Sequence, residues 1–454
     1  MSNIHKFKYK DDYFVLDVNS GAIHVLDKIV YDMIDEENFK NKEYYINKFE
    51  TKINKDTIDE CYGELKELKE KGQLYSKDIN PNIIENYENS PNYIKSICLN
   101  IAHDCNLICK YCFADGEGYD QQKKLMPIEV AKKSIDFLIE KSGNRKNVEV
   151  DFFGGEPLLN MDVVKKTVKY ARSMENKYNK RFRFTITTNA TLLNEEIMDY
   201  LDNNMINIVL SIDGRKTVND SIRVTKGHGG SYDRILPNIQ KMVEKRHKSK
   251  KQYYIRGTFT ANNLDFYEDI KHFIDLGFKE ISIEPVVLPD DNELAIKEEH
   301  LEEIYKQYDK ICSELSKSDD VIFYHFNMDI NGGPCIYKRI SGCGASFDYV
   351  AVTPDGDIYP CHQFVGNEDF HLGNVFEGEV NQGIASLFKE AHVYNKPECR
   401  NCWARFFCSG GCQANHYNFN GDFKVPYKIA CEMQKKRIEC AIALQYYRIH
   451  NIAK

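Results

Sequence analysis

The sequence predicts an α/β protein of three parts with a parallel sheet in the middle part. Three observations predict this. Strand-like and helix-like segments alternate from about residue 94 to 318, a polar segment with two prolines (78–92) precedes them, and glycine and cysteine dominate after about 319. The expected domains are therefore 1–78, 94–318 and 319–454.

Residues 1–78 combine short strands with a charged helix. Strand patterns at 13–16 and 22–26 flank an Asn-Ser-Gly turn signal. Within 56–73, four apolar residues fall on one helical face at spacings of three and four: Ile58, Cys61, Leu65 and Leu68. A strand pair with helices indicates a small winged-helix-like module.

Six strand-like segments define the middle part: YIKSICLNI, NVEVDFF, FRFTITT, INIVLSID, YYIRGTFT and EISIEPVVL. Amphipathic stretches separate them. In one of these, 127–142, five apolar residues share a face: Ile128, Ala131, Ile135, Leu138 and Ile139. Six such units imply a parallel sheet covered by helices, either an open doubly wound sheet or a partial (β/α)6 barrel. In both, ligands bind at the carboxyl ends of the strands.

Residues 319–454 show little periodicity before a final helical pattern at about 426–449. The preceding tract contains GGPC, SGCGAS, PDGDIYPC and CRNCWARFFCSGGC. A tract of this kind forms little apolar core of its own, so we expect bound metal to hold it together.

Composition narrows the class of function. The 454 residues carry a net charge of −8, with 42% hydrophobic and 29% charged residues. An acidic chain argues against a nucleic-acid backbone as the main partner. We find no apolar run of the ~18 residues that a membrane span requires and no secretory signal. We therefore expect a soluble cytoplasmic protein that binds neither nucleic acid nor membrane.

The chain has 15 cysteines, an odd number. In a reducing compartment disulfides are rare, which favours metal binding or catalysis. Four cysteines stand apart from the others and are expected to be small buried hydrophobes: Cys61, Cys98, Cys312 and Cys440.

The first cysteine motif is Cys105-x3-Cys109-x2-Cys112, directly after the first strand of the middle part. A [4Fe–4S] cluster takes one ligand per iron, so three thiolates leave one iron open to chelate a substrate or cofactor. The alternative is a zinc site with three sulfur ligands, for which His103 could be the fourth ligand.

This loop resembles the signature of the radical S-adenosylmethionine (radical SAM) superfamily. Tyr111 fills the aromatic position that packs against adenine in that family. Gly154-Gly155-Glu156-Pro157 ends the second strand and matches the GGEP motif, whose backbone contacts the methionine amino group of the cofactor. Glycines suit a backbone that approaches a ligand closely.

Two further strand ends fit the resemblance. Thr187-Thr188-Asn189 and Ser211-Ile212-Asp213-Gly214 supply polar groups to the ribose and methionine parts in relatives. Arg223 occupies the place of an arginine that binds the carboxylate, which suits the forked guanidinium. The resemblance thus implies cluster ligands Cys105, Cys109 and Cys112, and cofactor contacts from Tyr111, Gly154, Gly155, Glu156, Asn189, Ser211 and Arg223.

Seven later cysteines resemble the SPASM extension of peptide- and protein-modifying radical SAM enzymes. The resemblance assigns Cys343, Cys361 and Cys412 to auxiliary cluster I, and Cys399, Cys402, Cys408 and Cys431 to auxiliary cluster II. Two cubanes need eight ligands, so either Cys335 supplies the eighth or one iron is open, for example to a substrate thiolate. Two zinc sites with four sulfurs each are the alternative.

Over nearly its full length, the chain is similar to the maturases of six-cysteines-in-forty-five (SCIFF) peptides. Short matches carry this similarity: SGAIHVLD, ISGCG, YPCHQFVGN and ARFFCSGGC. The resemblance implies an N-terminal module that binds the leader of a ribosomally made, cysteine-rich precursor peptide as an added strand. It implies S-adenosylmethionine, three [4Fe–4S] clusters, and a reductase or flavodoxin- or ferredoxin-type electron donor.

The implied reaction forms Cys thioether crosslinks. The cofactor yields a 5′-deoxyadenosyl radical, a peptide carbon radical follows, a cysteine sulfur captures it, and the surplus electron leaves through an auxiliary cluster. The sequence identifies no residue as a catalytic base.

Two other functions are carried as alternatives. Anaerobic sulfatase maturases, which make formylglycine, have an aspartate where this chain has His362, and they lack the N-terminal module. A non-enzymatic zinc or iron–sulfur interaction protein would have no use for the GGEP motif, for Ser211 or for an open-iron loop.

Overall fold

The computed structural model describes residues 3–78, 81–112, 123–330 and 336–450. The chain forms two compact units. The first comprises Met1–Ser90, Phe326–Gly342 and Ala391–Lys454, and the second comprises Pro91–His325 and Cys343–Glu390.

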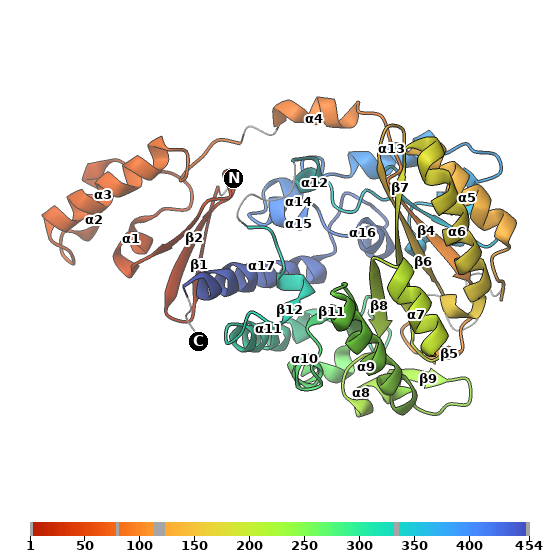
Figure 1. The fold of residues 1–454 in the computed structure, drawn as a ribbon. Coiled ribbons are helices and arrows are strands. Elements are labelled where there is room, and N and C mark those ends of the chain that lie inside the picture. Colours follow the sequence, from red (N-terminus) through yellow and green to blue (C-terminus); the bar gives the residue numbers. More distant parts are fainter. Residues whose placement is uncertain (1–2, 79–80, 113–122, 331–335, 451–454) are drawn as a thin grey trace. The chain divides into compact units, whose positions relative to one another are not determined.

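A ten-stranded sheet forms the centre of the second unit (Figure 1). Its six long strands are parallel and lie side by side in chain order: β4 (Ser96–Ala102), β6 (Asn147–Gly154), β7 (Arg181–Thr188), β8 (Asn207–Ser211), β10 (Tyr254–Phe259) and β11 (Glu280–Pro285). The six predicted strands and their parallel arrangement are confirmed. In a doubly wound sheet the strand order reverses at one point. The order of these six strands does not reverse.

Helices connect these strands: α5 (Ile128–Lys141), α6 (Met161–Tyr178), α7 (Glu195–Asn204), α8 (Lys216–Ile222), α9 (Tyr232–Ser249), α10 (Phe266–Asp275) and α11 (Leu301–Leu315). In α5, the predicted face is buried from Ala131 to Ile139, whereas Ile128 at its first turn is not. The Asn194 side chain caps α7 by accepting from the Ile197 amide. Right-handed crossovers between parallel strands in sequential order place the connecting helices on one face of a sheet. In Figure 1, α5, α6 and α7 lie together along one side of the strands.

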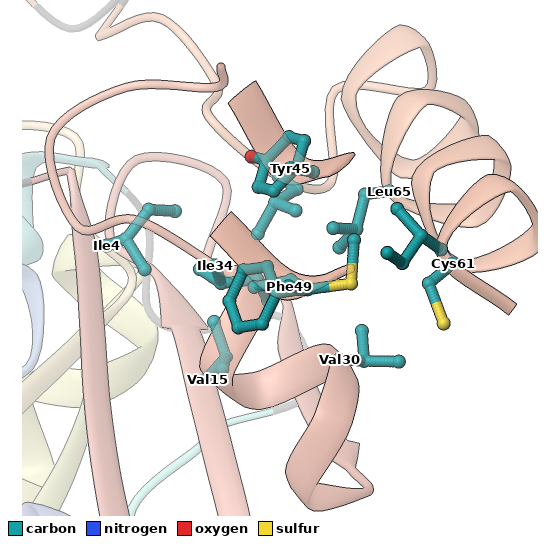
Figure 2. Packing of buried hydrophobic residues seen from close by; sticks show 11 residues of the cluster. Ile4, Val15, Val30, Ile34, Tyr45, Phe49, Cys61 and Leu65 are labelled. Atoms are coloured by element: carbon teal, nitrogen blue, oxygen red, sulfur yellow. The ribbon is translucent and has the colours of Figure 1, made fainter. Parts of the chain in front are cut away.

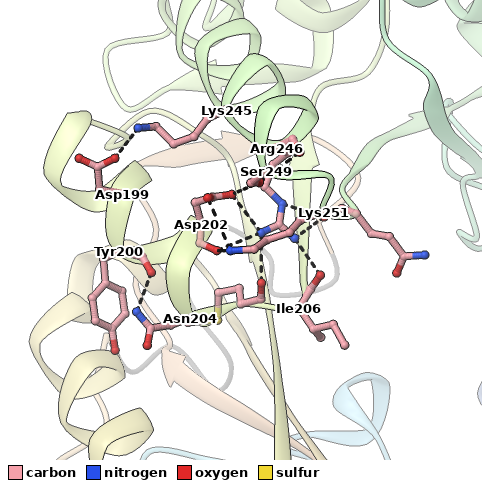
Figure 3. A network of polar contacts seen from close by, with 11 residues as sticks. Asp199, Tyr200, Asp202, Asn204, Ile206, Lys245, Arg246, Ser249 and Lys251 are labelled. Carbon is pink, nitrogen blue, oxygen red and sulfur yellow. Dashed lines mark hydrogen bonds and ion pairs between the residues drawn. The ribbon is translucent and has the colours of Figure 1, made fainter.

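A buried guanidinium ties two of these helices together (Figure 3). Arg246, near the end of α9, is fully buried and donates to the carbonyl oxygens of Met205 at 3.1 Å and Ile206 at 2.7 Å. Its Nη1 also faces the Asp202 carboxylate on α7 at 3.4 Å, and Ser249 donates to the same carboxylate at 2.8 Å. These bonds hold the segment that leads into β8.

Short strands extend the sheet at both edges: β12 (Ile322–Phe323) lies beyond β11, and three strands lie beyond β4. β13 (Tyr349–Val352) pairs parallel with β4, and β14 (Asp357–Tyr359) and β15 (Gly373–Asn374) follow antiparallel. The helix α13 (Gln382–Glu390) completes this segment. The sequence did not predict these strands, because two to four residues are too few for a periodic pattern.

The N-terminal module has a three-stranded antiparallel sheet: β1 (Ile4–Tyr9), β2 (Asp12–Asp17) and β3 (Ile23–Leu26). Three helices follow: α1 (Lys28–Met33), α2 (Lys42–Phe49) and α3 (Lys55–Glu70). Figure 2 shows side chains from the strands and helices meeting in one apolar cluster. The predicted helical face is part of it, with Ile58, Cys61 and Leu65 buried and Leu68 partly buried. The predicted strands and helix are confirmed, whereas β1 was not predicted.

The rest of the first unit is helical: α4 (Pro81–Glu88), α12 (Ile336–Ile340), α14 (Pro397–Arg400), α15 (Arg405–Cys408), α16 (Gln413–Asn420) and α17 (Lys428–Ile449). The predicted final helix is α17. The segment interpreted as a linker contains α4, which begins at a proline, as the first turn of a helix allows. The N-terminal strands contact this region directly: the His5 and Trp403 rings stack at 3.6 Å, and Phe14 meets Tyr446 edge-on at 5.6 Å.

The four cysteines expected to be small buried hydrophobes, Cys61, Cys98, Cys312 and Cys440, are all buried. No helix in the described ranges has both the length and the apolar character needed to cross a membrane.

Candidate active site

One pocket in the second unit collects most of the predicted site residues. It lies at the carboxyl ends of β4, β6, β7 and β8, where ligand sites form in such sheets. Nine predicted residues line it: Cys105, Cys109, Tyr111, Cys112, Gly154, Gly155, Asn189, Ser211 and Arg223. His103, Leu107, Phe153, Thr187 and Thr188 complete the lining. Glu156 is the only predicted cofactor contact that is not among the described lining residues.

The cysteine loop is held by a short antiparallel ladder. β5 (Leu107–Cys109) pairs with β9 (Arg223–Thr225), so that Cys109 lies opposite Arg223. The sulfur of Cys105 receives the Leu107 amide at 3.4 Å and Nδ2 of Asn189 at 3.6 Å. Burial raises the pKa of Cys105 to about 11 and that of Cys109 to about 12. These thiols stay protonated at neutral pH until a metal displaces the proton.

Gly154 and Gly155 are required by a close approach between two backbone segments. A Cβ atom on Gly154, whose φ is +122°, would lie 2.2 Å from the carbonyl oxygen of Ala102. A Cβ atom on Gly155 would lie 2.3 Å from that of Asp104. The Gly155 amide donates to Ala102 at 2.7 Å. We expected the glycines to admit a ligand, but the close approach seen here is to the chain that leads into Cys105.

The carboxylate of Glu156 joins the ends of two strands. It is fully buried and accepts from the Leu158 amide at 3.0 Å, the Thr188 hydroxyl at 2.7 Å and the Asn189 amide at 2.7 Å. These bonds fix the loop after β6 against the end of β7. Glu156 therefore positions residues that line the pocket, although it is not among the described lining residues itself.

Asn189 belongs to a side-chain network that the sequence did not reveal. Its Nδ2 donates to Asn106 at 2.9 Å, and its Oδ1 accepts from the Thr191 hydroxyl at 2.6 Å. Asn106 in turn donates to Thr191 at 2.7 Å. The position of Asn106, between the first two cysteines of the loop, was the available signal. The network locks the loop onto the end of β7.

Asp213 interacts with two further residues of the site, Tyr111 and Arg223. It is the second residue after β8 and accepts from the Tyr111 hydroxyl and from the Thr258 amide at 3.2 Å. Arg223 donates to the Tyr111 hydroxyl at 3.0 Å and faces Asp213 at 3.8 Å. Burial raises the pKa of Asp213 to about 6, and Arg223 opposes this shift. Tyr111 and Arg223 thus reach the pocket in fixed positions.

The four cysteines predicted for auxiliary cluster II lie near one another in the first unit. Burial raises the pKa of Cys399 and Cys431 to about 12 and that of Cys408 to about 11, and charge on the neighbouring cysteines adds to each shift. Cys402 contributes to all three shifts. The four cysteines therefore lie within electrostatic range of one another, and their role as ligands of one cluster stays a prediction.

The residues predicted for auxiliary cluster I are distributed differently. Cys343 is exposed and Cys361 is buried, both in the second unit, whereas Cys412 belongs to the first. Cys335 lies outside the described residues. In the described ranges, no three His, Cys, Asp or Glu side chains converge closely enough to hold a single metal ion. An iron–sulfur cluster instead takes one cysteine per iron.

Comparison with known proteins places this site in a family. The profile of the radical SAM superfamily matches residues 99–270. An uncharacterized protein of Methanocaldococcus jannaschii is 30% identical over 317 residues, which are 69% of this chain and 96% of that protein. The chain belongs to the radical SAM superfamily. The profile of the SPASM iron–sulfur cluster-binding domain matches residues 343–403.

Other radical SAM proteins resemble the chain at lower identity. The radical SAM cyclopropyl synthase TigE of Paramaledivibacter caminithermalis is 25% identical over 75% of this chain and 72% of TigE. The structure of anSMEcpe with bound AdoMet has a TM-score of 0.63 at 20% identity, covering 79% of this chain and 99% of that one. SuiB of Streptococcus suis bound to S-adenosylmethionine has a TM-score of 0.54 at 16% identity, covering 94% and 97%. These two structures share the fold.

The pocket of this radical SAM protein fits a [4Fe–4S] cluster beside S-adenosylmethionine. Three cysteines line it, and no fourth cysteine is among its described lining residues. Such a donor set leaves one iron open. A buried arginine and the polar ends of β7 and β8 face the same space, which suits a cofactor that carries a carboxylate and hydroxyl groups.

Proposed function

We propose that this radical SAM enzyme installs sulfur-to-carbon thioether crosslinks in a ribosomally made, cysteine-rich precursor peptide of the SCIFF type. The core would be a partial (β/α)6 barrel, flanked by the leader-binding domain 1–78 and the SPASM domain 319–454. S-adenosylmethionine, when bound, would supply the radical chemistry for removing a hydrogen from the peptide. The chain itself must bind the cofactor, hold the peptide near it and exclude water.

The pocket residues have separate proposed roles in holding the cofactor. Cys105, Cys109 and Cys112 would bind the cluster. Arg223 would pair with the cofactor carboxylate, and its position opposite Cys109 favours this role. The amides of Gly155 and Glu156 already donate to the carbonyl oxygens of Ala102 and Asp104. The segment would therefore bind the cofactor through its own carbonyl oxygens, which suits the cofactor's ammonium group.

Auxiliary clusters I and II would use the cysteine sets assigned above, for three [4Fe–4S] clusters in all. A thiol must lose its proton before it bonds to carbon, and coordination to iron deprotonates thiols. A substrate cysteine would lose its proton by binding to an open iron of cluster I.

The N-terminal module supports a peptide substrate. SuiB, which has been solved with its precursor peptide SuiA, matches 94% of this chain, whereas anSMEcpe matches 79%. β3 lies at an edge of the three-stranded sheet, where a peptide can add as a further strand. This near-complete match to a precursor-peptide enzyme is the observation that carries the proposal.

Formylglycine formation is the second candidate, because the cysteine-type anaerobic sulfatase-maturating enzyme of Clostridium novyi is 24% identical over 69% of this chain. His362 weighs against it. The expected aspartate is replaced by an imidazole that packs against Phe153 at 5.1 Å, and burial lowers its pKa to about 4. A neutral histidine does not supply the carboxylate that the sulfatase maturases place there.

Mass spectrometry of the product peptide tests the proposal. A thioether removes two hydrogens per crosslink and leaves one cysteine per crosslink unreactive toward alkylating agents. Formylglycine instead carries an aldehyde that reacts with hydrazines. We expect thioethers that form only on a peptide with its leader. An aldehyde product, or equal modification of leaderless peptide, contradicts the proposal.

A further inference from the structure

Lys396 is a fully buried cation in the first unit, three residues before Cys399. Its Nζ donates to the carbonyl oxygen of Gly410 at 2.9 Å. In the described part of the chain, no carboxylate forms an ion pair with this ammonium group. Burial lowers its pKa, whereas charge on Cys399, Cys408, Cys412 and Cys431 raises it. Lys396 is the N-cap residue of α14, which carries Cys399. The cysteine sulfurs, which become thiolates when they bind a metal, are thus the acidic groups that act on this lysine.

The loop around Lys396 holds the ammonium in one place. Gly410 adopts a φ of +86°, and a Cβ atom there would lie 3.6 Å from Nζ of Lys396. The Tyr427 amide donates to Nδ1 of His416, so Nε2 carries the proton and donates to the same Gly410 oxygen at 2.7 Å. With that oxygen shared, two of the three ammonium protons remain for other acceptors.

We propose that Lys396 raises the reduction potential of auxiliary cluster II through its fixed positive charge. This inference rests on the proposed function in one respect, that Cys399, Cys402, Cys408 and Cys431 hold a cluster. Net charge, hydrogen bonds to sulfur and burial are the levers by which a protein sets such a potential. A buried cation stabilises the reduced cluster, which carries one more negative charge than the oxidised cluster.

Other charges near the set offset one another. Lys435 acts on Cys402 and Cys431, but it pairs with Glu432 at 2.7 Å. That pair is partly exposed, so solvent screens it. Arg405 is also buried, but of these cysteines it acts on Cys402, and the carboxylates of Asp78 and Asp17 face it as well. Lys396 acts on Cys399, Cys408 and Cys431, and no carboxylate is among the groups that raise its pKa.

The test is a redox titration of the full-length protein followed by electron paramagnetic resonance. The cluster II signal is the one that disappears in a Cys399→Ala/Cys402→Ala variant. For Lys396→Met and for Lys396→Gln, which keeps a neutral donor, the equilibrium constant for one-electron reduction should fall at least tenfold, or about 59 mV. Lys396→Arg should stay within threefold of the wild type.

A second buried lysine provides the control. Lys180 in the other unit donates to the carbonyl oxygens of Gly143 at 2.6 Å and Arg145 at 2.8 Å. Lys180→Met should leave the cluster II potential unchanged.

Iron content separates the ways in which the inference can fail. An unchanged potential in both neutral Lys396 variants, with iron retained, overturns it. So does loss of cluster iron in both, because Lys396 would then serve folding alone. If the double cysteine variant binds as much iron as the wild type, the cluster assignment itself fails, and this inference fails with it.

Discussion

The hydroxyl of Tyr111 donates a hydrogen bond to the carboxylate of Asp213 at 2.8 Å. This bond joins the cysteine loop to the second residue after β8. Arg223 donates to the same hydroxyl at 3.0 Å, so one phenol group connects the loop, the strand end and the arginine. The position of the aromatic ring in the pocket therefore depends on a polar contact behind it.

Tyr111→Phe keeps the ring but removes this connection. Asp213 would lose a donor in a buried place, which costs on the order of 1–3 kcal/mol of unfolding free energy. We also expect weaker binding of S-adenosylmethionine, measured by equilibrium dialysis. Tyr170→Phe is the matched control, because Tyr170 donates to Asp136 at 2.7 Å outside the pocket. Equal cofactor binding by Tyr111→Phe and the wild type would show that the connection is dispensable.

Cys109→Ala should leave the fold intact and abolish 5′-deoxyadenosine formation. The loop lies outside the core of the sheet, so its loss costs little stability, whereas the cluster loses one of three ligands. Cys312→Ala removes a fully buried cysteine on α11 and should retain activity with modest destabilisation. Chromatographic detection of 5′-deoxyadenosine decides the matter. Normal cofactor cleavage by Cys109→Ala would rule out Cys109 as a ligand.

Anaerobic reconstitution should yield about 12 irons and 12 sulfides per chain from three cubanes. Replacing Cys105, Cys109 and Cys112 together should lower this by about four irons, because the auxiliary cysteines lie elsewhere in the chain. Metal and sulfide analysis provides the measurement. Zinc in place of iron after anaerobic purification would instead favour structural zinc sites in the C-terminal part.

Leu65→Ala should uncouple peptide modification from cofactor cleavage. Leu65 is fully buried in the apolar cluster of the N-terminal module, and its truncation costs about 2–5 kcal/mol. Peptide modification should fall sharply while slow cofactor cleavage continues, because the pocket belongs to the other unit. Leu68→Ala, at a partly buried position of the same helix, should have a smaller effect. Undiminished modification by Leu65→Ala, despite a destabilised module, would argue against leader binding there.

Deleting residues 1–78 should have the same outcome as Leu65→Ala. The deletion also uncovers Trp403 and Tyr446, so the point variant is the sharper test.

Stability should decline as pH rises from about 4 to 6, in part because of Asp151 on β6. Burial raises the pKa of Asp151 to about 6, and Glu149 adds to the shift. Over this range the unfolded chain releases a proton that the folded chain keeps, so the folded state loses on the order of 1–3 kcal/mol. Urea unfolding of Asp151→Asn should show a flatter pH profile. Glu196→Gln, at a carboxyl whose pKa Lys165 lowers, should not flatten it. A profile of Asp151→Asn identical to that of the wild type would exclude this source of pH dependence.

The sheet could be predicted because its strands carry a clear pattern: β6 and β7 alternate buried apolar residues with less buried ones, and β4 is buried throughout. β1 could not, because His5, Lys6 and Lys8 interrupt its apolar residues. Its burial comes from residues more than 400 positions away, as the contact between Tyr9 and Tyr447 shows. α4 was hidden by Pro81 and by the polar residues around it.

The cysteines of the site could be predicted because their spacing is itself the signal. The residues that hold these cysteines in place could not be predicted from the sequence. Asn106 and Thr191 belong to no spacing pattern, and Lys396 resembles any surface lysine until the fold buries it. For Glu156, the motif indicated the position, but only the structure shows that its oxygens accept from Thr188 and from two backbone amides.

The ladder between β5 and β9 limits how the length of the chain can vary. Because successive residues of a strand point to opposite sides, a deletion of one residue inside either strand would turn Arg223 away from the pocket. The tip of the turn at 226–229 is exposed and lies between the bridged residues Val224 and Gly230, so extra residues there would not shift the register of the ladder. Among natural variants, insertions should therefore accumulate in that turn, and the interval from Cys105 to Cys109 should keep a constant length.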